Sequence, residues 1–432
     1  MRILSTTLCL EKAGSHVLAL SLASAMAEQG HTVYLFNQGE QLVDKGMVAQ
    51  YLSPKVPVIA MDRYPLVNKL CWKINALLYR LGARFSFHEK CKTLLLLFAV
   101  IYYRIEVVHG HEVLVENSRL TTLCRWLSVP VVITDHGGYS MLIKMGNWSF
   151  VPFANLGKAV VAVSNNAAQL LRHSGATAFS EEMRVLGARI MAADFQSEHN
   201  TVQQGQNAVT APLTVPVVTI YNGVRAASAA VLSQVPDRRE LGIEPTDLVF
   251  GMIGRGTEQK GWHYAVDAFL RLLENNPDRA MKFLCMGEGP ALDDIRTRLG
   301  GQQPAIIFVG NVDNPHQYMP LCDIGLMPSC FSEGLPLSII EFYEHGIPVI
   351  ASNLGGIPEI ITPANEAPGG QLVAMQPQGT PQPESLLSCM QQYIDAPAAL
   401  AAHGQGARRI RTKFDMDTCA KAYQQLFTEI LA

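Results

Sequence analysis

Short runs of β-branched residues alternate with longer helical stretches through both halves of the chain, and this alternation limits the fold more than any other feature. Such alternation is typical of parallel sheets with helices packed on both faces. At 432 residues the chain is also longer than one compact core usually holds. We therefore predict an α/β fold with two Rossmann-like domains that face each other across a cleft.

The strand candidates divide into two groups on either side of a polar segment at 198–212, which we predict to be a surface loop. A hinge is expected near Asn222 and Gly223. The resulting domains are 1–220 and 221–405, and a C-terminal helix within 406–432 is expected to pack back toward the first domain. The predicted strands are 2–4, 32–36, 57–61, 107–111, 130–137 and 159–164 in the first half, and 248–255, 282–289, 305–310, 324–329, 347–352 and 370–374 in the second.

Composition excludes several classes of protein. A net charge of −3 gives no general attraction to nucleic acid, so we expect no nucleic-acid partner. The nine cysteines include no CxxC pair, which favours reduced thiols and a cytoplasmic protein. The first residues have too short an apolar run for a signal peptide, and the apolar run at 94–103 is too short to span a bilayer.

Two glutamates stand eight positions apart in "FSEGLPLSIIEFYEHGIPVIASNLGG". On one continuous helix, Glu333 and Glu341 would be roughly 12 Å apart, whereas the carboxyl pair of a glycosidase lies roughly 5 to 9.5 Å apart. We therefore expect Glu333 in a loop and Glu341 in a helix, each accepting hydrogen bonds from hydroxyls at different ends of a long ligand. The amides of Gly334, Leu335 and Leu337 would offer an anion site at the helix start. Together these groups suit a nucleotide sugar; the alternative is a capped helix with solvated acids.

A second candidate follows the predicted strand at 248–255. Arg255 and Lys260 lie five residues apart where the strand gives way to a helix, and the carboxyl ends of parallel strands face the ligand crevice. Arginine grips a diphosphate with two hydrogen bonds, and lysine adds a point charge. The alternative is a solvated loop. The "MGEGP" at 286–290 lacks a full dinucleotide fingerprint and is better explained as a tight turn.

Three histidines end strands in the first half: His109, His111 and His136. His136, next to Asp135 and two glycines, is the strongest candidate for ligand contact, although such histidines are often simply packed. Neither a HExxH motif nor a Cys/His cluster accompanies them, so we expect no metal. The "DMD" at 415–417 resembles a metal-binding acid pair, but helix capping explains it better.

The segment 63–104, called here the basic arm, has eight Lys or Arg residues and one acid, Glu89. On a helical wheel its cations gather on one face beside a row of leucines, which is typical of a helix lying on an anionic membrane surface. The alternative is a core helix whose cations reach out to solvent. The cations are Lys69, Lys73, Arg80 and Arg84, and the apolar residues are Leu66, Leu70, Ile74, Leu77 and Leu81.

Several motifs occur together in a characteristic order. The stretch 248–373 has "GR" with "KG" following, "MPS" before an E-x7-E pattern, and "GGIPEII". The first half adds "AGSH", "VVHGHE" and "TDHGG", and "IYNGV" comes between the halves. Taken together, these motifs resemble the retaining GT-B glycosyltransferases of family 4.

The resemblance implies a retaining hexosyltransferase. It would move a sugar from a nucleotide-diphosphate sugar, by default a UDP-sugar, to a hydroxyl of a glycan or a lipid-linked acceptor, in cell-surface polysaccharide or lipopolysaccharide biosynthesis. The first domain would bind the acceptor and the second the donor. No cofactor, divalent metal or protein general base would be required. We expect the protein in the cytoplasm, with peripheral attachment to the inner face of the cytoplasmic membrane through the basic arm.

The resemblance also implies a role for each matching residue. His136, Glu333, Arg255 and Lys260 would form the catalytic set, with Arg255 and Lys260 on the donor diphosphate. The donor site would further include Gly14, Gly310, Val312, Gly334, Leu335, Leu337 and Glu341, with Glu341 on the ribose and the backbone at 310–312 on the base. His109, His111 and Asp135 are acceptor-side candidates.

Two other functions share such a cleft. One is a GT-B sugar-nucleotide epimerase or phosphorylase. The other is a sugar-nucleotide-binding subunit without catalytic activity. Base, sugar, linkage and acceptor depend on pocket shape and backbone contacts, so the motifs leave them open.

Overall fold

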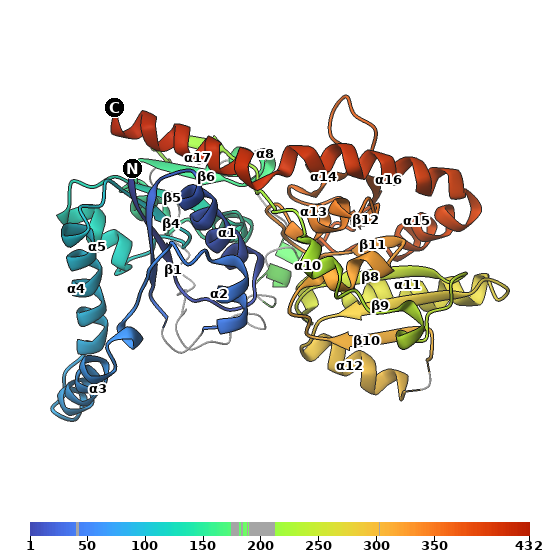
Figure 1. Cartoon of the computed structure of the whole chain (residues 1–432), viewed down its shortest axis with the longest axis horizontal. Coiled ribbons are helices and arrows are strands. Elements are labelled where there is room, and N and C mark those ends of the chain that lie inside the picture. Colours follow the sequence, from blue (N-terminus) through green and yellow to red (C-terminus); the bar gives the residue numbers. More distant parts are fainter. Residues whose placement is uncertain (40–42, 174–180, 183–184, 188, 190–211, 302) are drawn as a thin grey trace.

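The computed structural model describes residues 1–39, 43–173, 181–182, 185–187, 189, 212–301 and 303–432. Two sheets with flanking helices lie side by side, the N-terminal half on the left of Figure 1 and the C-terminal half on the right. The segment predicted as a polar loop, 198–212, falls outside the described residues except for Pro212. Among the described residues, no helix is long and apolar enough to cross a membrane.

The N-terminal sheet has seven parallel strands in the order β3-β2-β1-β4-β5-β6-β7. Its central strands consist largely of buried valine, isoleucine and alanine, as expected when helices cover both faces. The strands are β1 (Arg2–Thr7), β2 (Thr32–Asn37), β3 (Val58–Ile59), β4 (Val107–Gly110), β5 (Val131–Asp135), β6 (Ala159–Ala162) and β7 (Val217–Thr219). The helices are α1 (Gly14–Glu28), α2 (Lys45–Tyr51), α3 (Pro65–Arg80), α4 (Phe87–Tyr102), α5 (Arg119–Trp126), α6 (Gly138–Lys144), α7 (Val151–Ala154) and α8 (Asn165–Arg172).

The C-terminal sheet has six parallel strands in the order β10-β9-β8-β11-β12-β13. The strands are β8 (Leu248–Ile253), β9 (Met281–Met286), β10 (Ile306–Gly310), β11 (Ile324–Met327), β12 (Val349–Ser352) and β13 (Gly370–Val373). The helices are α10 (Ala229–Leu232), α11 (Trp262–Asn275), α12 (Pro290–Leu299), α13 (Leu337–Glu344), α14 (Ile357–Ile361), α15 (Pro383–Asp395), α16 (Pro397–Arg411) and α17 (Met416–Leu431).

Both sheets reverse their strand order next to their first strand. In the N-terminal sheet the chain runs outward from β1 to β3 and then returns to the other side of β1 with β4; β8 and β11 repeat this arrangement in the second sheet. Ligands of open α/β sheets bind outside the carboxyl ends of strands at such a reversal. The topology thus predicts a ligand site at the loops that follow β1 and β8. The first leads into α1 at Gly14, and the second holds Arg255.

The predicted α/β fold with two Rossmann-like units is confirmed, and three local predictions differ. The segment before the hinge adds a seventh strand, β7, which the sequence did not single out. The strand expected at 57–61 is reduced to β3. Helix α3 ends at Arg80, so Leu81 and Arg84 lie beyond it and do not continue its face.

The chain passes between the halves twice, and the two crossings touch. Val224 donates its backbone N–H to the carbonyl of Phe414 at 2.8 Å, and Arg411 donates to the carbonyl of Val224 at 2.9 Å. Gly223 lies so close to Met416 that a Cβ there would collide with its backbone. Helix α16 runs along the C-terminal half, while α17 crosses back and packs on α1 (Figure 1).

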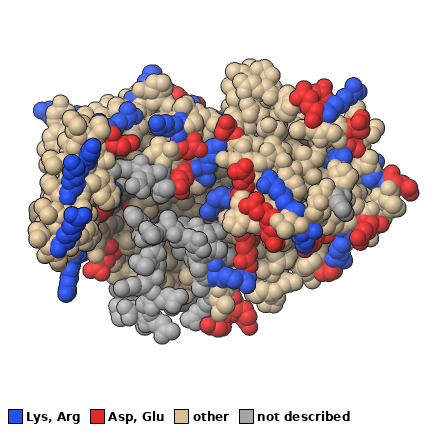
Figure 2. Space-filling model, turned by 90° about the horizontal axis from the view of Figure 1, so that it is seen from below, with Lys and Arg blue, Asp and Glu red and all other residues tan. Residues whose placement is uncertain are grey.

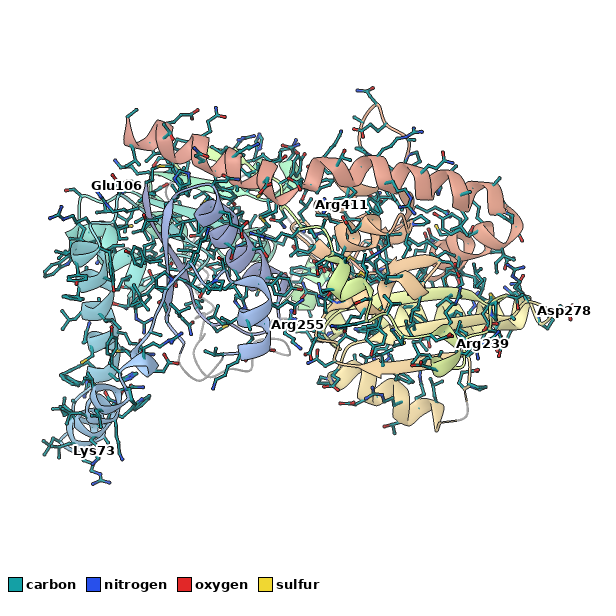
Figure 3. All side chains as sticks on the ribbon, in the orientation of Figure 1. Lys73, Glu106, Arg239, Arg255, Asp278 and Arg411 are labelled. Carbon is teal, nitrogen blue, oxygen red and sulfur yellow. The ribbon has the colours of Figure 1, made fainter. Side chains whose placement is uncertain are left out.

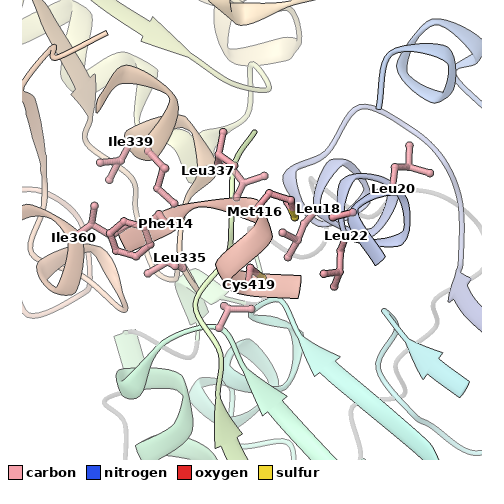
Figure 4. Close-up of a cluster of buried hydrophobic side chains, with 14 of the residues drawn as sticks. Leu18, Leu20, Leu22, Leu335, Leu337, Ile339, Ile360, Phe414, Met416 and Cys419 are labelled. Carbon is pink, nitrogen blue, oxygen red and sulfur yellow. The ribbon is translucent and has the colours of Figure 1, made fainter. Parts of the chain in front are cut away.

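One hydrophobic cluster extends through both halves. It contains Leu18 and Leu22 of α1, Leu337 of α13, and Met416 and Cys419 of α17. Figure 4 shows these side chains gathered around the start of α17. Because α17 contributes its buried face to the first half while its chain arrives from the second, it joins the two sheets through apolar packing.

Candidate active site

A cavity of about 1480 Å³ lies between the two sheets. It is bounded by the loops after β1 and β8 and by the loop before α13, as the reversal of strand order predicts. Most of the predicted site residues line this one cavity: Gly14, His111, Asp135, His136, Arg255, Lys260, Val312, Glu333, Gly334, Leu335, Leu337 and Glu341. His109 and Gly310 do not line it, although Asn311 and Val312, which follow Gly310, do.

Lys260 and Glu333 form the central charge pair of the C-terminal side. The Lys260 ammonium donates to Glu333 Oε1 at 2.6 Å, and both side chains are largely buried. Ser329 Oγ donates to the same oxygen at 2.9 Å. Two donors on one carboxylate oxygen hold Glu333 in a defined orientation, and a charge-assisted bond of this length is among the stronger hydrogen bonds.

Arg255 extends from the loop after β8 toward the space between the halves (Figure 3). The loop is anchored from behind, because Trp262 Nε1 donates to the Arg255 carbonyl at 2.8 Å. Gly261, with φ of 76°, turns the chain into α11, where any side chain would collide with the Pro328 carbonyl. This turn places Arg255 and Lys260 on the same cavity wall.

The glycine pair Gly355 and Gly356, which ends the stretch "FSEGLPLSIIEFYEHGIPVIASNLGG", holds the loop of Glu333. Gly356 donates its N–H to the Glu333 carbonyl at 3.3 Å. A Cβ on Gly355, whose φ is 57°, would collide with that carbonyl, and a Cβ on Gly356 would collide with the Gly334 carbonyl. Backbone approach this close requires glycine, so the two residues position Glu333 without contacting the cavity themselves.

Glu341 lies on α13, whereas Glu333 lies in the loop before it. Burial raises the pKa of Glu341 to about 7, although nearby Arg411 opposes the shift. A buried carboxyl that lines a cavity is well suited to accept hydrogen bonds from a polar ligand.

The N-terminus of α1 faces the same cavity. Its N-cap, Ala13, has no side chain that could accept a hydrogen bond, and Gly14 and Ser15 line the cavity. The first amides of a helix of 15 residues are thus left for a ligand, and the helix dipole favours a negative one. Gly14 also lies beside Leu337 of α13, since a Cβ there would be 3.8 Å from its side chain.

His111 and His136 form a pair on the N-terminal side. His111 Nδ1 and His136 Nε2 are 2.9 Å apart, so one ring donates to the other. Burial, together with His16, lowers the pKa of His136 to about 3, and burial among neighbouring histidines also lowers the pKa of His111. Both rings are therefore neutral at physiological pH, and the pair can hold His136 in one tautomer.

Two acceptor-side candidates have structural contacts instead. His109 does not reach the cavity: Nε2 lies 2.7 Å from Thr134 Oγ1, and the ring packs against Tyr423 of α17. Asp135 lines the cavity, but its carboxylate accepts the backbone N–H groups of Gly137 and Tyr139 and the hydroxyl of Ser140, so it caps α6.

A polar network on the N-terminal side of the cavity was not predicted from the sequence. Glu112 is buried and accepts a hydrogen bond from Gln38, and burial raises its pKa to about 7. Arg119 donates to Gln38 at 2.6 Å and pairs with Glu89. All four side chains line the cavity. Glu112 directly follows His111 in the "VVHGHE" motif, and this adjacency was the available signal.

Lys144 was also missed. It lies on α6 in the N-terminal half, and its ammonium is 3.3 Å from the Phe331 carbonyl and from Ser332 Oγ. Burial lowers the pKa of Lys144 to about 8. It therefore ties the loop of Glu333 to the opposite half of the molecule.

Within the part of the chain that the structure describes, no group of three His, Cys, Asp or Glu side chains is arranged to hold a metal ion. The "DMD" segment caps a helix as predicted, because Asp415 accepts the N–H groups of Asp417 and Thr418 at the start of α17.

Two sequence families match the chain. The family described as "Glycosyl transferases group 1" matches residues 247–392, and "Glycosyltransferase Family 4" matches residues 13–186. Together they span well over half of the sequence and include the loops that form the cavity. The chain belongs to the family 4 (group 1) glycosyltransferases.

Characterised relatives of this glycosyltransferase are distant. The lipopolysaccharide core biosynthesis mannosyltransferase LpsB of Rhizobium meliloti is 25% identical over 226 residues, which are 51% of this chain and 62% of LpsB. The D-inositol 3-phosphate glycosyltransferase of Jonesia denitrificans is 27% identical over 360 residues, or 80% of this chain and 76% of that protein. The match with LpsB thus spans less than two thirds of that enzyme.

Solved structures share the GT-B fold. Anabaena Alr3699/HepE in complex with UDP and glucose has a TM-score of 0.63 at 18% identity, and the match covers 99% of this chain and 100% of that one. WaaG, a glycosyltransferase involved in lipopolysaccharide biosynthesis, has a TM-score of 0.61 at 11% identity, covering 99% of each chain. At these identities the likeness shows the fold alone.

Proposed function

We propose that this glycosyltransferase moves a hexose, with retention of anomeric configuration, from a nucleotide-diphosphate sugar to a hydroxyl of a glycan or lipid-linked acceptor. The observation that carries the proposal is the convergence of three groups on one cavity: the uncapped N-terminus of α1, the cations Arg255 and Lys260, and the carboxylates Glu333 and Glu341. Groups that bind an anion, together with carboxylates that accept hydrogen bonds, match a ligand that has both a diphosphate and sugar hydroxyls.

The donor's diphosphate would lie between Arg255 and the α1 N-terminus. Arg255 would bind it bidentately, and the amides at Gly14 and Ser15 would donate to it. Lys260 would share its charge between the diphosphate and Glu333, which it already contacts. Cations here would stabilise the charge that grows on the diphosphate as the glycosidic bond breaks.

Glu333 would accept hydrogen bonds from the transferred sugar, Glu341 from the ribose, and the backbone near Val312 would meet the base. Neutral His136, supported by His111, would lie beside the sugar and the acceptor. Transfer would break the bond from the anomeric carbon to the diphosphate oxygen and form one to the acceptor oxygen on the same face. The departing oxygen would take the acceptor's proton, so no protein base is required.

A role in cell-surface polysaccharide or lipopolysaccharide biosynthesis is supported by the relatives' activities. Besides LpsB, the relatives include an Escherichia coli enzyme named UDP-Gal:alpha-D-GlcNAc-diphosphoundecaprenol alpha-1,3-galactosyltransferase, 29% identical over 151 residues, 34% of this chain and 38% of that enzyme. The solved complexes of Anabaena Alr3699/HepE with UDP and UDP-glucose make a UDP-sugar the first donor to test.

Calorimetric titration with UDP, GDP, ADP and CMP and their sugar conjugates tests the donor assignment, with and without Mg²⁺. We expect one nucleotide to bind and Arg255→Ala to abolish that binding while thermal unfolding stays unchanged. Arg279→Ala, which changes an exposed arginine outside the cavity, is the control. Failure of every nucleotide to bind would contradict the donor site.

Three competing functions are distinguished by what each would release or consume. A phosphorylase would release sugar phosphate when supplied with inorganic phosphate, and an epimerase would convert the donor without any acceptor. A subunit without catalytic activity would bind the donor and never consume it. Product analysis by mass spectrometry, with and without acceptor, separates these three outcomes from transfer.

A further inference from the structure

The basic arm leaves its apolar face uncovered. On α3, Leu66, Leu70 and Leu77 expose between 56 and 83% of their surface. On α4, Leu94, Phe98 and Ile101 expose between 57 and 66%. Residues three and four apart share a helix face, so each set forms a row. Contiguous exposed apolar residues mark a surface that binds something, and on α3 they argue against a core helix. Helix α4 packs Leu96, Ala99 and Val100 into the N-terminal core and leaves its outer row exposed.

Cations flank the leucine row on α3. Lys69, Lys73 and Arg80 are exposed and lie within a quarter-turn of each other on the helical wheel, on the face adjacent to the leucines. Among the described residues, no acidic side chain pairs with any of the three. Lys73 projects from the far tip of the arm, away from the rest of the molecule (Figure 3). Figure 2 shows Lys and Arg predominating over acids at this end of the molecule.

The arm's single acid does not oppose this charge. Glu89 lines the cavity, where it pairs with Lys92 at 3.1 Å and with Arg119. The outer surface of residues 63–104, all of which the structure describes, therefore combines leucines, cations and no free acid. Trp72 and Tyr79 add exposed aromatic rings to α3, and such rings favour the boundary between headgroups and acyl chains.

The surface continues into the cavity. Phe85, Lys90 and Leu94 are exposed on the arm and also line the cavity, as does the exposed Trp126 of α5. The same cavity extends to Lys260 and Glu341 in the C-terminal half. A molecule held in a membrane against the arm would thus meet the mouth of the N-terminal side of the cavity.

We propose that α3 and the outer face of α4 dock on an anionic lipid bilayer and present the cavity mouth to acceptors held in that bilayer. The leucines would enter the boundary between headgroups and acyl chains while the cations meet the anionic headgroups. An anionic bilayer fits better than a second copy of the chain, because two copies would bring their unpaired cations together. The docking itself does not depend on the proposed donor, whereas delivery of a lipid-linked acceptor rests on the proposed function.

Cosedimentation with vesicles tests the proposal, using phosphatidylcholine alone and phosphatidylcholine with phosphatidylglycerol. We expect binding to the anionic vesicles alone, weakened by salt. Each cation contributes about five-fold in affinity, so loss of three positive charges should weaken binding by on the order of a hundred-fold. Lys69→Glu, Lys73→Glu and Arg80→Glu combined should weaken it further, because each change also adds a negative charge. The control combines Arg279→Glu, Arg409→Glu and Lys421→Glu, which reverse three exposed cations on other elements.

A second variant tests the apolar row. Leu66→Ser, Leu70→Ser and Leu77→Ser combined should abolish vesicle binding and leave thermal stability and nucleotide binding unchanged, since none of the three lines the cavity. Equal sedimentation with both vesicle types, or a dimer in light scattering that the leucine variant dissociates, would overturn the docking. Nucleotide titration of the same samples separates the two proposals: vesicle binding without nucleotide binding would contradict the donor site alone.

Discussion

At the residue scale, the C-terminal side of the cavity is organised by a pairing of opposite charges. Lys260 neutralises Glu333 across 2.6 Å, and the glycine pair at Gly355 and Gly356 holds the carboxylate's loop from behind. Glu341 has no such cation in direct contact, and its pKa rises to about 7. Two glutamates close in sequence thus have different surroundings, because only Glu333 contacts a lysine.

Glu333→Gln tests the proposed contact with the sugar. The amide keeps the size of the side chain but removes a charged acceptor, so we expect turnover to fall by about one to three orders of magnitude while the fold survives. Steady-state kinetics with the donor identified by titration gives the measurement. Glu384→Gln, on the exposed side of α15, is the control, and turnover near that of the unmodified protein would remove Glu333 from the site.

The raised pKa of Glu341 predicts that stability and donor affinity both depend on pH. Its pKa is raised from 4.5 to about 7 in the folded protein, so it stabilises the ligand-free fold fully below 4.5, and this contribution is lost as pH rises through 7. If Glu341 binds the ribose as proposed, the ribose hydroxyls donate better to its carboxylate than to the protonated carboxyl. Donor affinity should therefore rise about ten-fold per pH unit below 7 and level off above it. Titration across this range measures the effect, and Glu341→Gln should flatten both profiles.

At the element scale, the position of Glu333 depends on loops whose backbones come into direct contact at glycines. The loop before α13 meets the loop before α14 through Gly355 and Gly356, and it meets the N-terminal half where Gly334 lies against the His136 carbonyl. The first contact could not form with side chains present, and a side chain at Gly334 would force its neighbours to shift. The same loop receives the buried ammonium of Lys144 from α6, so elements of both halves position Glu333.

Gly355→Ala isolates the effect of close packing. Gly355 and Gly300 share a φ of 57°, but a Cβ at Gly300 has no atom within 4 Å, whereas one at Gly355 collides with the Glu333 carbonyl. Strain at positive φ costs about 1–2 kcal/mol in both variants. We expect Gly300→Ala to lose only that amount of unfolding free energy, and Gly355→Ala to lose more and to impair turnover. Equal losses in chemical denaturation would contradict the contact.

At the scale of the whole molecule, several contacts join the two halves. Glu359 of α14 accepts the N–H groups of Asn165 and Asn166 at the start of α8, at 2.9 and 2.8 Å. Lys12 pairs with Asp313 at 2.7 Å. Together with the apolar cluster around α17, these contacts make the cavity a shared feature of both sheets, and we propose the hinge near Gly223 as the place where they articulate.

We expect calorimetric unfolding in one transition, because one hydrophobic cluster crosses both halves. Phe427→Ala removes a fully buried ring of α17 and should cost about 3–5 kcal/mol of unfolding free energy. Leu431→Ala, on the same helix but 40% exposed, should cost under about 0.5 kcal/mol. Two separated transitions in the unmodified protein would show that the halves unfold independently.

The sequence by itself determined the alternation of strands and helices, the two sheets and the loops that carry Gly14, Arg255 and Glu333. These are local properties: hydrophobic period, glycine positions and residues at strand ends follow from neighbours in the chain. The missed strand β7 also follows from this limit, since three half-buried residues at the edge of a sheet give little periodic signal.

Only the tertiary structure decided which of these residues meet. His109 and His111 stand two positions apart, yet α17, more than 300 residues later, covers the first while the second reaches the cavity. Lys260 pairs with Glu333, which lies 73 positions later in the chain. The leucines of α3 stay exposed because no other described element covers them. Contacts between distant segments depend on how whole layers pack, and a helix with one apolar face has the same sequence whether a core or a membrane receives it.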